Sequence, residues 1–134
     1  MKRPIGVIGL GIMGSAMAAN LAKAGFKVQG YDLVAKRRTV DAISKIDAPV
    51  VITSLPSADA LHAVAGELKH RCVVMETSTL PIDDKVAARN TLAKKGITLL
   101  DCPLSGTGAQ ARAKDLVIFV SGDRAGAKKV EAFL

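Results

Sequence analysis

Short apolar runs alternate along the chain with longer Ala-rich stretches whose apolar residues have helical spacing. Most of the short runs lack polar alternation, which is typical of strands covered on both faces. The predicted strands are Ile5–Ile8, Phe26–Tyr31, Val50–Ser54, Cys72–Met75, Ile97–Leu100 and Leu116–Ser121. The predicted helices are Met13–Ala24, Val34–Ile43, Ala58–Leu68, Asp83–Lys95 and Ala125–Leu134. This alternation predicts one α/β domain over residues 1–134, with right-handed crossovers and a mainly parallel sheet.

The composition favours an aliphatic core. Apolar residues make up 49% of the 134 residues and aromatic residues only 3%, which suits a buried parallel sheet under Ala-rich helices. No apolar stretch approaches the roughly 18 residues needed to span a membrane, so we expect no membrane partner. The opening residues Met1-Lys2-Arg3-Pro4 do not have the pattern of a secretory signal. The expected compartment is therefore the cytoplasm.

The charged and sulfur-containing residues argue against several classes of site. The formal net charge of +7 allows an anionic partner such as nucleic acid, a lipid surface or a phosphorylated small molecule. The basic residues are dispersed, however, and no aromatic side chains lie among them, so we expect a solvated surface and no nucleic-acid partner. Cys72 and Cys102 each lie in or beside an apolar run. They are interpreted as buried reduced thiols, with neither a disulfide nor a metal site.

The turn after the first predicted strand, Gly9-Leu10-Gly11-Ile12-Met13-Gly14, has the pattern G-x-G-x-x-G. This pattern is a weak signal alone, but here an apolar strand precedes it and an amphipathic helix follows. The first glycine allows a tight turn, the second lets the backbone approach a pyrophosphate, and the third lets the helix lie against the strand. The turn therefore predicts a Rossmann-type, doubly wound fold that binds a dinucleotide at the helix N-terminus. A glycine turn without a ligand is the alternative.

An acidic residue, Asp32, ends the second predicted strand, 21 residues beyond Gly11. A carboxylate at this place accepts hydrogen bonds from the ribose hydroxyls of a dinucleotide and repels a 2′-phosphate, so Asp32 favours NAD over NADP. The neighbouring Lys36, Arg37 and Arg38 leave NADP open, because a guanidinium that folds back could neutralise the phosphate. The other interpretation of these basic residues is an exposed helix face.

Four motifs in sequence order resemble the β-hydroxyacid dehydrogenase family. The family includes 3-hydroxyisobutyrate dehydrogenase, tartronate semialdehyde reductase and, more distantly, 6-phosphogluconate dehydrogenase. The resemblance begins at the glycine turn and continues through Asn20-Leu21. The other three motifs are Ser54-Leu55-Pro56, Thr77-Ser78-Thr79 and Asp101-Cys102-Pro103-Leu104-Ser105-Gly106-Thr107. Together they span nearly the whole chain, which is far more specific than the glycine turn.

The resemblance implies roles for the later motifs. Leu55 and Pro56 are expected to line the cofactor, and Thr79 to lie by its nicotinamide end. In the family, main-chain N–H groups and a serine hydroxyl bind the carboxylate and hydroxyl of the substrate. These groups correspond here to Ser105, Gly106 and Thr107. The stretch from Ser105 onwards is similar to a branch that acts on sugar acids such as threonate.

The chain also departs from the family pattern. Thr107 replaces the second glycine of a Ser-Gly-Gly element, and Gln110, Lys114 and Asp115 replace Gly, Gly and Thr. The stretch from Asp32 to Leu55 is short by roughly one helix turn and a strand, at the place of an edge strand. The segment before Cys72 is also short. Either the domain is a pared-down variant or segments are missing from the sequence.

The family's general acid/base is a lysine in a C-terminal helical domain, which is absent from these 134 residues. No catalytic residue is therefore assigned, and His62 and His70 are expected to be solvated. The resemblance implies the NAD(P)-binding domain of an oxidoreductase that exchanges hydride with a β-hydroxyacid or sugar acid, inactive or weakly active alone and able to self-associate. The alternatives are a non-catalytic nucleotide-sensing module, an anion-binding protein, and a relative of imine reductases or 6-phosphogluconate dehydrogenase.

Overall fold

Five strands form one parallel sheet, and their order places β1 in its interior. The structure, a computed structural model, describes residues 3–114 and 117–133. The strands are β1 (Pro4–Ile8), β2 (Lys27–Tyr31), β3 (Val50–Thr53), β4 (Val73–Glu76) and β5 (Thr98–Asp101). Their order is β2-β1-β3-β4-β5, with every neighbouring pair parallel. The predicted doubly wound α/β fold is confirmed.

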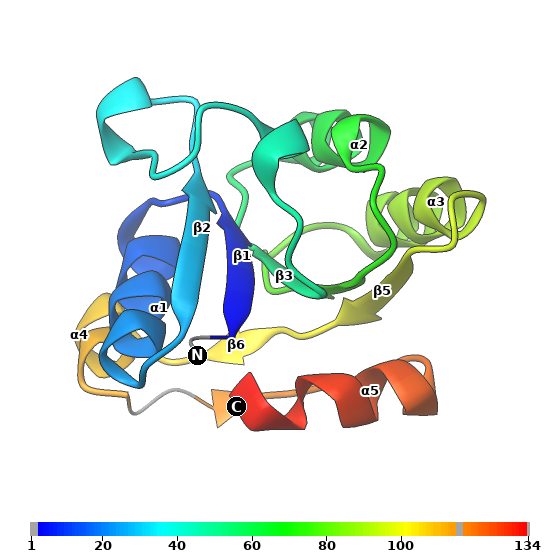
Figure 1. Ribbon diagram of the computed structural model, residues 1–134. Coiled ribbons are helices and arrows are strands. Elements are labelled where there is room, and N and C mark those ends of the chain that lie inside the picture. Colours follow the sequence, from blue (N-terminus) through cyan, green and yellow to red (C-terminus); the bar gives the residue numbers. More distant parts are fainter. Residues whose placement is uncertain (1–2, 115–116, 134) are drawn as a thin grey trace.

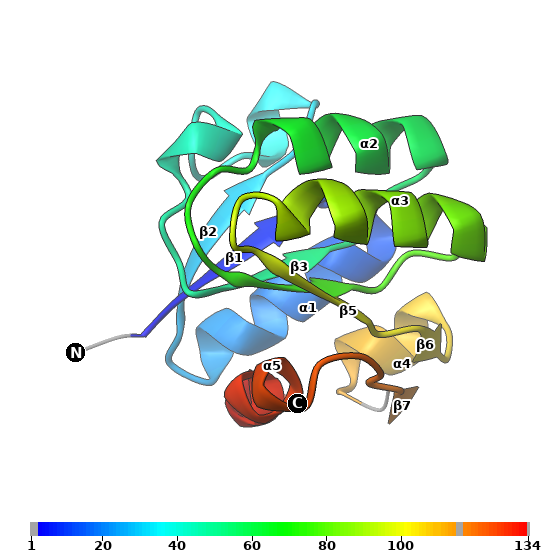
Figure 2. The ribbon, with the colours of Figure 1, turned by 90° about the vertical axis from the view of Figure 1, so that its right-hand side faces the viewer.

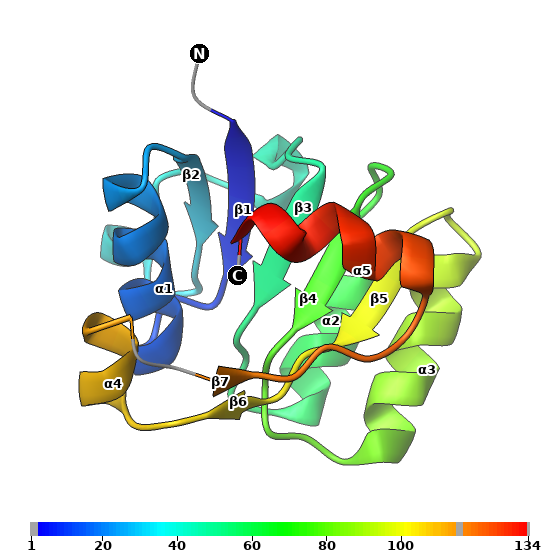
Figure 3. The same ribbon diagram turned by 90° about the horizontal axis from the view of Figure 1, so that it is seen from below.

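Helices cover both faces of this sheet. Helices α1 (Ile12–Lys23) and α5 (Arg124–Val130) lie on one face, and α2 (Ala58–Glu67) and α3 (Ile82–Ala93) lie on the other (Figures 1, 2 and 3). Successive side chains of a strand point to opposite faces, so a strand covered on both sides must be apolar at every position. The four residues Val50–Thr53 are all buried, which explains the uninterrupted apolar runs of the sequence.

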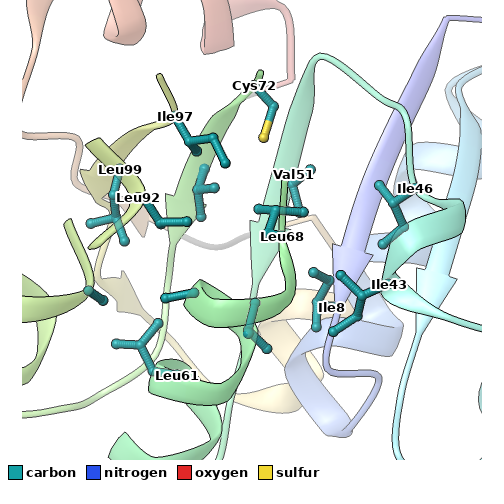
Figure 4. Close-up of a cluster of buried hydrophobic side chains, with 14 of the residues drawn as sticks. Ile8, Ile43, Ile46, Val51, Leu61, Leu68, Cys72, Leu92, Ile97 and Leu99 are labelled. Carbon is teal, nitrogen blue, oxygen red and sulfur yellow. The ribbon is translucent and has the colours of Figure 1, made fainter. Parts of the chain in front are cut away.

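Two layers of aliphatic side chains hold the helices to the sheet. Val51 and Ile8 point toward α2 and α3, where they pack with Leu61 and Leu92 (Figure 4). Val7 and Ile52 belong to the opposite layer, which also contains residues of α1 and α5. Both layers are almost free of aromatic side chains, as the composition predicted.

The connection from β2 to β3 differs from the prediction. The helix expected over Val34–Ile43 is wrong, because the segment forms two short 3-10 turns, Ala35–Arg37 and Ile43–Lys45, with an irregular, bent stretch between them. This stretch closes the open edge of β2. The Gly30 N–H donates to Thr39 Oγ1 at 2.7 Å, and the Gly30 carbonyl accepts from the N–H groups of Thr39 and Val40 at 2.9 and 3.1 Å. An edge strand needs such partners, and a helix here would not have supplied them.

The last predicted strand, Leu116–Ser121, does not join the parallel sheet. Its described part forms β7 (Val117–Ile118), which pairs antiparallel with β6 (Leu104–Ser105). Further on, Ser121 forms an antiparallel bridge to Asp101. A parallel pairing needs a long crossover, and the helix between the two strands, α4 (Gly108–Arg112), has only five residues. Leu116 and Asp115 lie outside the described residues.

The other predicted helices are present with small shifts of their ends. The chain closes with α5 and a 3-10 turn, Glu131–Phe133, whose Phe133 ring packs on Phe26 with centroids 4.8 Å apart; Leu134 lies outside the described residues. Within residues 3–114 and 117–133, no helix is long and apolar enough to cross a membrane.

The buried side chain of Gln29 ties β2 to the chain that enters β3. Its Oε1 accepts hydrogen bonds from the backbone N–H groups of Asp47 and Ala48, both at 3.1 Å. Its Nε2 donates to Asp47 Oδ1 at 2.7 Å. One amide therefore satisfies two backbone donors, one of them buried, in a segment without regular structure.

Replacing this amide is expected to destabilise the domain. The Gln29→Leu variant has a side chain of similar size but leaves two backbone N–H groups without an acceptor. The free energy of unfolding should therefore fall by about 2–3 kcal/mol. Urea unfolding followed by circular dichroism measures this change. Gln110→Leu, which alters an exposed capping glutamine, is the matched control and should cost less than about 1 kcal/mol. Equal stabilities of the two variants would contradict the role of Gln29.

Candidate functional site

The loops that carry the sequence motifs leave the sheet at one edge. Strands β1, β3, β4 and β5 are parallel, so their carboxyl ends lie together, and Figure 3 shows α4, β6 and β7 beyond these ends. The chain turns from β1 to β2 on one side, while β3 lies on the other side of β1. Such a reversal opens a crevice at the carboxyl ends of an α/β sheet.

The glycine turn depends on two close backbone approaches. Gly9 has a φ of +94°, and a Cβ at this position would lie 2.0 Å from the Ser54 carbonyl oxygen. A Cβ on Gly14 would lie 1.8 Å from the Gly9 carbonyl oxygen. Only glycine fits at either position, because the conflicting atoms belong to the backbone. Helix α1 is thereby held directly against the turn.

Gly11 differs from its two neighbours in the motif. A Cβ there would have no heavy atom within 4 Å, so the fold itself does not require glycine. Gly11 is the N-cap of α1, where it provides no side-chain cap, and no acidic residue lies in the first helical turn. The N–H groups of that turn therefore face an open space that suits an anion.

Asp32 is bonded to the glycine turn. Its Oδ2 accepts the Leu10 N–H at 2.7 Å, and its Oδ1 accepts the Val34 N–H at 2.8 Å. The Arg37 guanidinium lies 3.8 Å from Oδ1. Burial by itself would raise the pKa of Asp32, but the two amide hydrogen bonds and the charges of Arg37 and Arg38 hold that pKa below its usual value. Asp32 is therefore a carboxylate at neutral pH.

A cleft of about 470 Å³ lies between the glycine turn, the end of β2 and helix α2. Its wall is mostly apolar, with the Asp32 carboxylate at one side. The structure brings together in this wall most of the predicted cofactor residues, namely Gly9, Gly11, Ile12, Met13, Asp32, Leu55 and Pro56. Leu10 and Gly14 shape the turn behind the wall, and Thr79 is an exposed residue of a neighbouring loop.

A buried carboxylate that the sequence analysis missed joins two of the loops. Glu76, at the end of β4, is fully buried and accepts hydrogen bonds from the Thr53 hydroxyl and, at 2.6 Å, from the Ser78 N–H. The Ser78 hydroxyl in turn accepts the Leu55 N–H at 2.7 Å. The only signal in the sequence was an acidic residue at the end of an apolar run. Glu76 thus fixes the loops of Leu55 and Thr79 relative to each other.

The predicted acid-binding loop continues into α4. Thr107 is the N-cap of this helix: its hydroxyl accepts the Gln110 N–H at 3.2 Å, and its own N–H donates to Gln110 Oε1 at 2.8 Å. Two departures from the family pattern are therefore partners in one capping box. The Thr107 N–H is already used within the loop, whereas Ser105 and Gly106 lie on its exposed surface.

This loop rests on the helix that begins at the glycine turn. A Cβ on Gly108 would lie 2.7 Å from Ile12 Cγ2, so the two segments are in close contact. The Asn20 side chain, in the C-terminal half of α1, donates to the Ala111 carbonyl at 2.6 Å. The predicted acid-binding loop therefore continues into a helix that packs against α1, as Figures 1 and 3 show.

Lys85, Asp101 and Cys102 lie near this edge and are buried or paired within the protein. The Nζ of Lys85, a buried residue of α3, lies 2.7 Å from Asp101 Oδ1. Burial raises the pKa of the Cys102 thiol to about 12, and the carboxylates of Asp101 and Glu76 add to this effect while Lys85 opposes it.

Both histidines are hydrogen-bonded within the protein. His62 Nε2 lies 2.9 Å from Asp84 Oδ1, and His70 Nε2 lies 2.7 Å from the Ala48 carbonyl oxygen. His62 thus links α2 to α3 at the surface. Across the described part of the chain, no three His, Cys, Asp or Glu side chains are grouped so that they could hold a metal ion.

Comparison with known proteins yields matches over nearly the whole chain. Residues 4–134 match the family described as the NAD binding domain of 6-phosphogluconate dehydrogenase. The L-threonate dehydrogenase of Cupriavidus necator is 33% identical over 142 residues, covering 91% of this chain and 47% of that protein. The NAD-dependent L-serine dehydrogenase of Pseudomonas aeruginosa is 33% identical over 141 residues, covering 90% of this chain and 47% of the relative.

A solved structure shows the same arrangement. The 3-hydroxyisobutyrate dehydrogenase of Mycobacterium tuberculosis, solved with L-serine, superposes with a TM-score of 0.88 at 28% identity, covering 100% of this chain and 51% of the other. The chain thus spans about half the length of the relatives it matches. The alignment to the Cupriavidus protein, 142 residues long, exceeds the 134 residues of this chain, so that relative has positions without a counterpart here.

Substitution of Gly14 is expected to cost far more stability than substitution of Gly11. Gly14→Ala forces a methyl group into the Gly9 carbonyl, so the free energy of unfolding should fall by about 3 kcal/mol. Gly11→Ala meets open space and should cost no more than about 1 kcal/mol, mainly through the poorer N-cap. Thermal unfolding of the two variants measures the difference. A Gly14→Ala protein as stable as Gly11→Ala would refute the close approach.

The buried thiols predict a loss of stability at high pH. Burial raises the pKa of Cys72 from its ordinary 9.0 to about 11, and the pKa of Cys102 is about 12. Above pH 9 the unfolded chain therefore loses thiol protons that the folded chain keeps. The contribution of the two buried thiols to the free energy of unfolding is complete below pH 9 and disappears as the pH rises through 11 to 12. Urea unfolding at pH 8 and pH 10.5 tests this: Cys72→Ala/Cys102→Ala should show the smaller decline, and equal declines would contradict the prediction.

Proposed function

The chain belongs to the family of the NAD binding domain of 6-phosphogluconate dehydrogenase, and we propose that residues 1–134 hold the dinucleotide of a hydroxyacid dehydrogenase in the cleft beside the glycine turn. The observation that carries this proposal is the Leu10–Asp32 hydrogen bond. It places a carboxylate suited to ribose hydroxyls directly beside a turn suited to phosphates.

The residues of the turn fit a diphosphate. The open side of Gly11 gives a ligand access to the backbone, and the first-turn N–H groups of α1 have no side-chain cap. Helix α1 has twelve residues, so its dipole adds to the attraction for an anion. The apolar wall of Leu55 and Pro56 suits the adenosine part of the cofactor.

The charges around Asp32 favour NAD while leaving NADP possible. The Asp32 carboxylate would repel a 2′-phosphate on the neighbouring ribose. Arg37 has a side chain that is 47% exposed and lies beside the same carboxylate, so it is the cation available to a phosphate. Arg38 is bound to backbone carbonyl oxygens and is therefore not available.

Ser105 and Gly106 are the residues we assign to the acid group of a small hydroxyacid or sugar acid. Their support is the exposed loop beside the glycine turn and the family resemblance of their motif, with Thr107 contributing mainly the cap of α4. Thr79 is assigned to the nicotinamide end. The nicotinamide, when bound, supplies the hydride chemistry, and the chain orients it.

We assign no general acid/base within this chain. Lys85 is buried and its Nζ is paired with Asp101, so it is engaged within the protein. The chain by itself is therefore expected to bind NADH with little or no turnover, since a positioned acid/base contributes roughly 10²–10⁴-fold. Self-association and the lack of nucleic-acid binding stay predictions. A non-catalytic nucleotide-binding module is the alternative, and an L-threonate or L-serine effect on NADH affinity would speak against it.

Titration with NADH, followed by the fluorescence of the cofactor, tests the proposal. Asp32→Ala should weaken NADH binding about 10- to 100-fold, because hydrogen bonds to a charged group are worth about 1.5–3 kcal/mol, and it should weaken NADPH binding less. Asp83→Ala, which removes an exposed carboxylate at the start of α3, is the control for charge and should change neither. Absence of NADH binding to the parent chain would refute the function, and equal losses for both cofactors would refute the role of Asp32.

A further inference from the structure

We propose that Arg38 is the positioning residue of the ribose site, because it clamps the turn that carries Asp32. This inference rests on the proposed function, since it concerns the affinity for the dinucleotide. Arg38 does not itself line the cleft, but it contacts three residues that do, Tyr31, Asp32 and Leu33. Its effect on the cofactor would pass through the backbone of Tyr31, Asp32 and Leu33.

The guanidinium of Arg38 has an unusual number of partners on that turn. Its Nε donates to the Asp32 carbonyl at 2.7 Å, and one terminal nitrogen donates to the Leu33 carbonyl at 3.3 Å. The same nitrogen lies 3.5 Å from the Tyr31 hydroxyl. The guanidinium also stacks over the Tyr31 ring, 4.8 Å from its centroid. One side chain thus holds three consecutive residues.

The turn needs such a clamp in this chain. Strand β2 is the edge of the sheet, so no neighbouring strand supports the residues that follow it on the outer side. The segment that closes this edge bends at Thr39 and Val40, directly after Arg38, and the N–H groups of both residues donate to the Gly30 carbonyl. The residue after Arg38 is therefore bonded to the edge of β2, and the Arg38 side chain reaches back to the end of the same strand.

Arg37 provides a matched comparison. Both arginines lower the pKa of Asp32 through their charge, but Arg37 is half exposed and has a single ion pair of 3.8 Å. Removing either side chain therefore takes one positive charge from the neighbourhood of Asp32, and only removal of Arg38 releases the turn. Lysine at position 38 would keep the charge but lose the planar fork that reaches several oxygens.

The experiment compares NADH dissociation constants, measured by cofactor fluorescence at a temperature where circular dichroism shows every variant folded. We expect Arg38→Ala to weaken NADH about 10-fold and Arg38→Lys nearly as much, as for the loss of a hydrogen bond to a charged group. Arg37→Ala should change NADH affinity less than about 3-fold. Equal effects of Arg37→Ala and Arg38→Ala would show that charge alone matters and would overturn the proposal.

A double-mutant cycle with Asp32→Ala separates positioning from general stabilisation. If Arg38 acts through Asp32, Arg38→Ala should weaken NADH little further in the Asp32→Ala background. If it weakens NADH by the same factor in both backgrounds, Arg38 acts on the fold as a whole and the proposal fails. If the parent chain binds no NADH, the proposed function is refuted, and the role of Arg38 with it. If the parent chain binds NADH and Arg38→Ala binds it equally well, only the role of Arg38 is refuted.

Discussion

The hydrogen bond between the Leu10 amide and the Asp32 carboxylate joins two parts of the chain that are 22 residues apart. The glycine turn provides backbone donors, and the end of β2 provides an acceptor with a negative charge. Neither half would recognise a dinucleotide alone, because a phosphate site lacks selectivity for a sugar and a lone carboxylate lacks affinity for a phosphate. The parallel pairing of β1 with β2 sets their separation, so the geometry of the site depends on the register of these two strands.

The parts of the fold that depend on local rules could be predicted from the sequence. The strands of the central sheet are apolar at successive positions because helices cover both faces, and the roles of Gly9 and Gly14 follow from the close approach of their backbones. The helix at Val34–Ile43 was predicted wrongly because helical spacing there competed with the need of β2 for edge partners. That need arises only when the neighbouring strand is absent, so a local pattern does not contain it.

Side-chain hydrogen bonds to irregular backbone were equally out of reach. Gln29, Glu76 and Arg38 each stand in unremarkable sequence surroundings, yet each bonds a backbone group outside the helices and strands, namely the N–H of Ala48, the N–H of Ser78 and the carbonyl of Asp32. Gln29 lies in β2, and Arg38 lies in the connection from β2 to β3. Hydrogen bonds from these two side chains therefore hold a connection whose regular structure is limited to two short 3-10 turns.

The polar groups at the carboxyl edge of the sheet fall into two sets. One set holds the loops in place, and the other is available to ligands. Glu76 is fully buried, and such a carboxylate is tolerated only when hydrogen bonds replace its water. Thr53 and Ser78 provide these bonds, and the Lys85 ammonium donates a hydrogen bond to the Asp101 carboxylate. Because these groups satisfy one another inside the protein, the first-turn N–H groups of α1 and the exposed Ser105 loop remain for external partners. Substitutions in the buried set would therefore act on binding only through loop position, whereas changes at Gly11 or Asp32 would act on it directly.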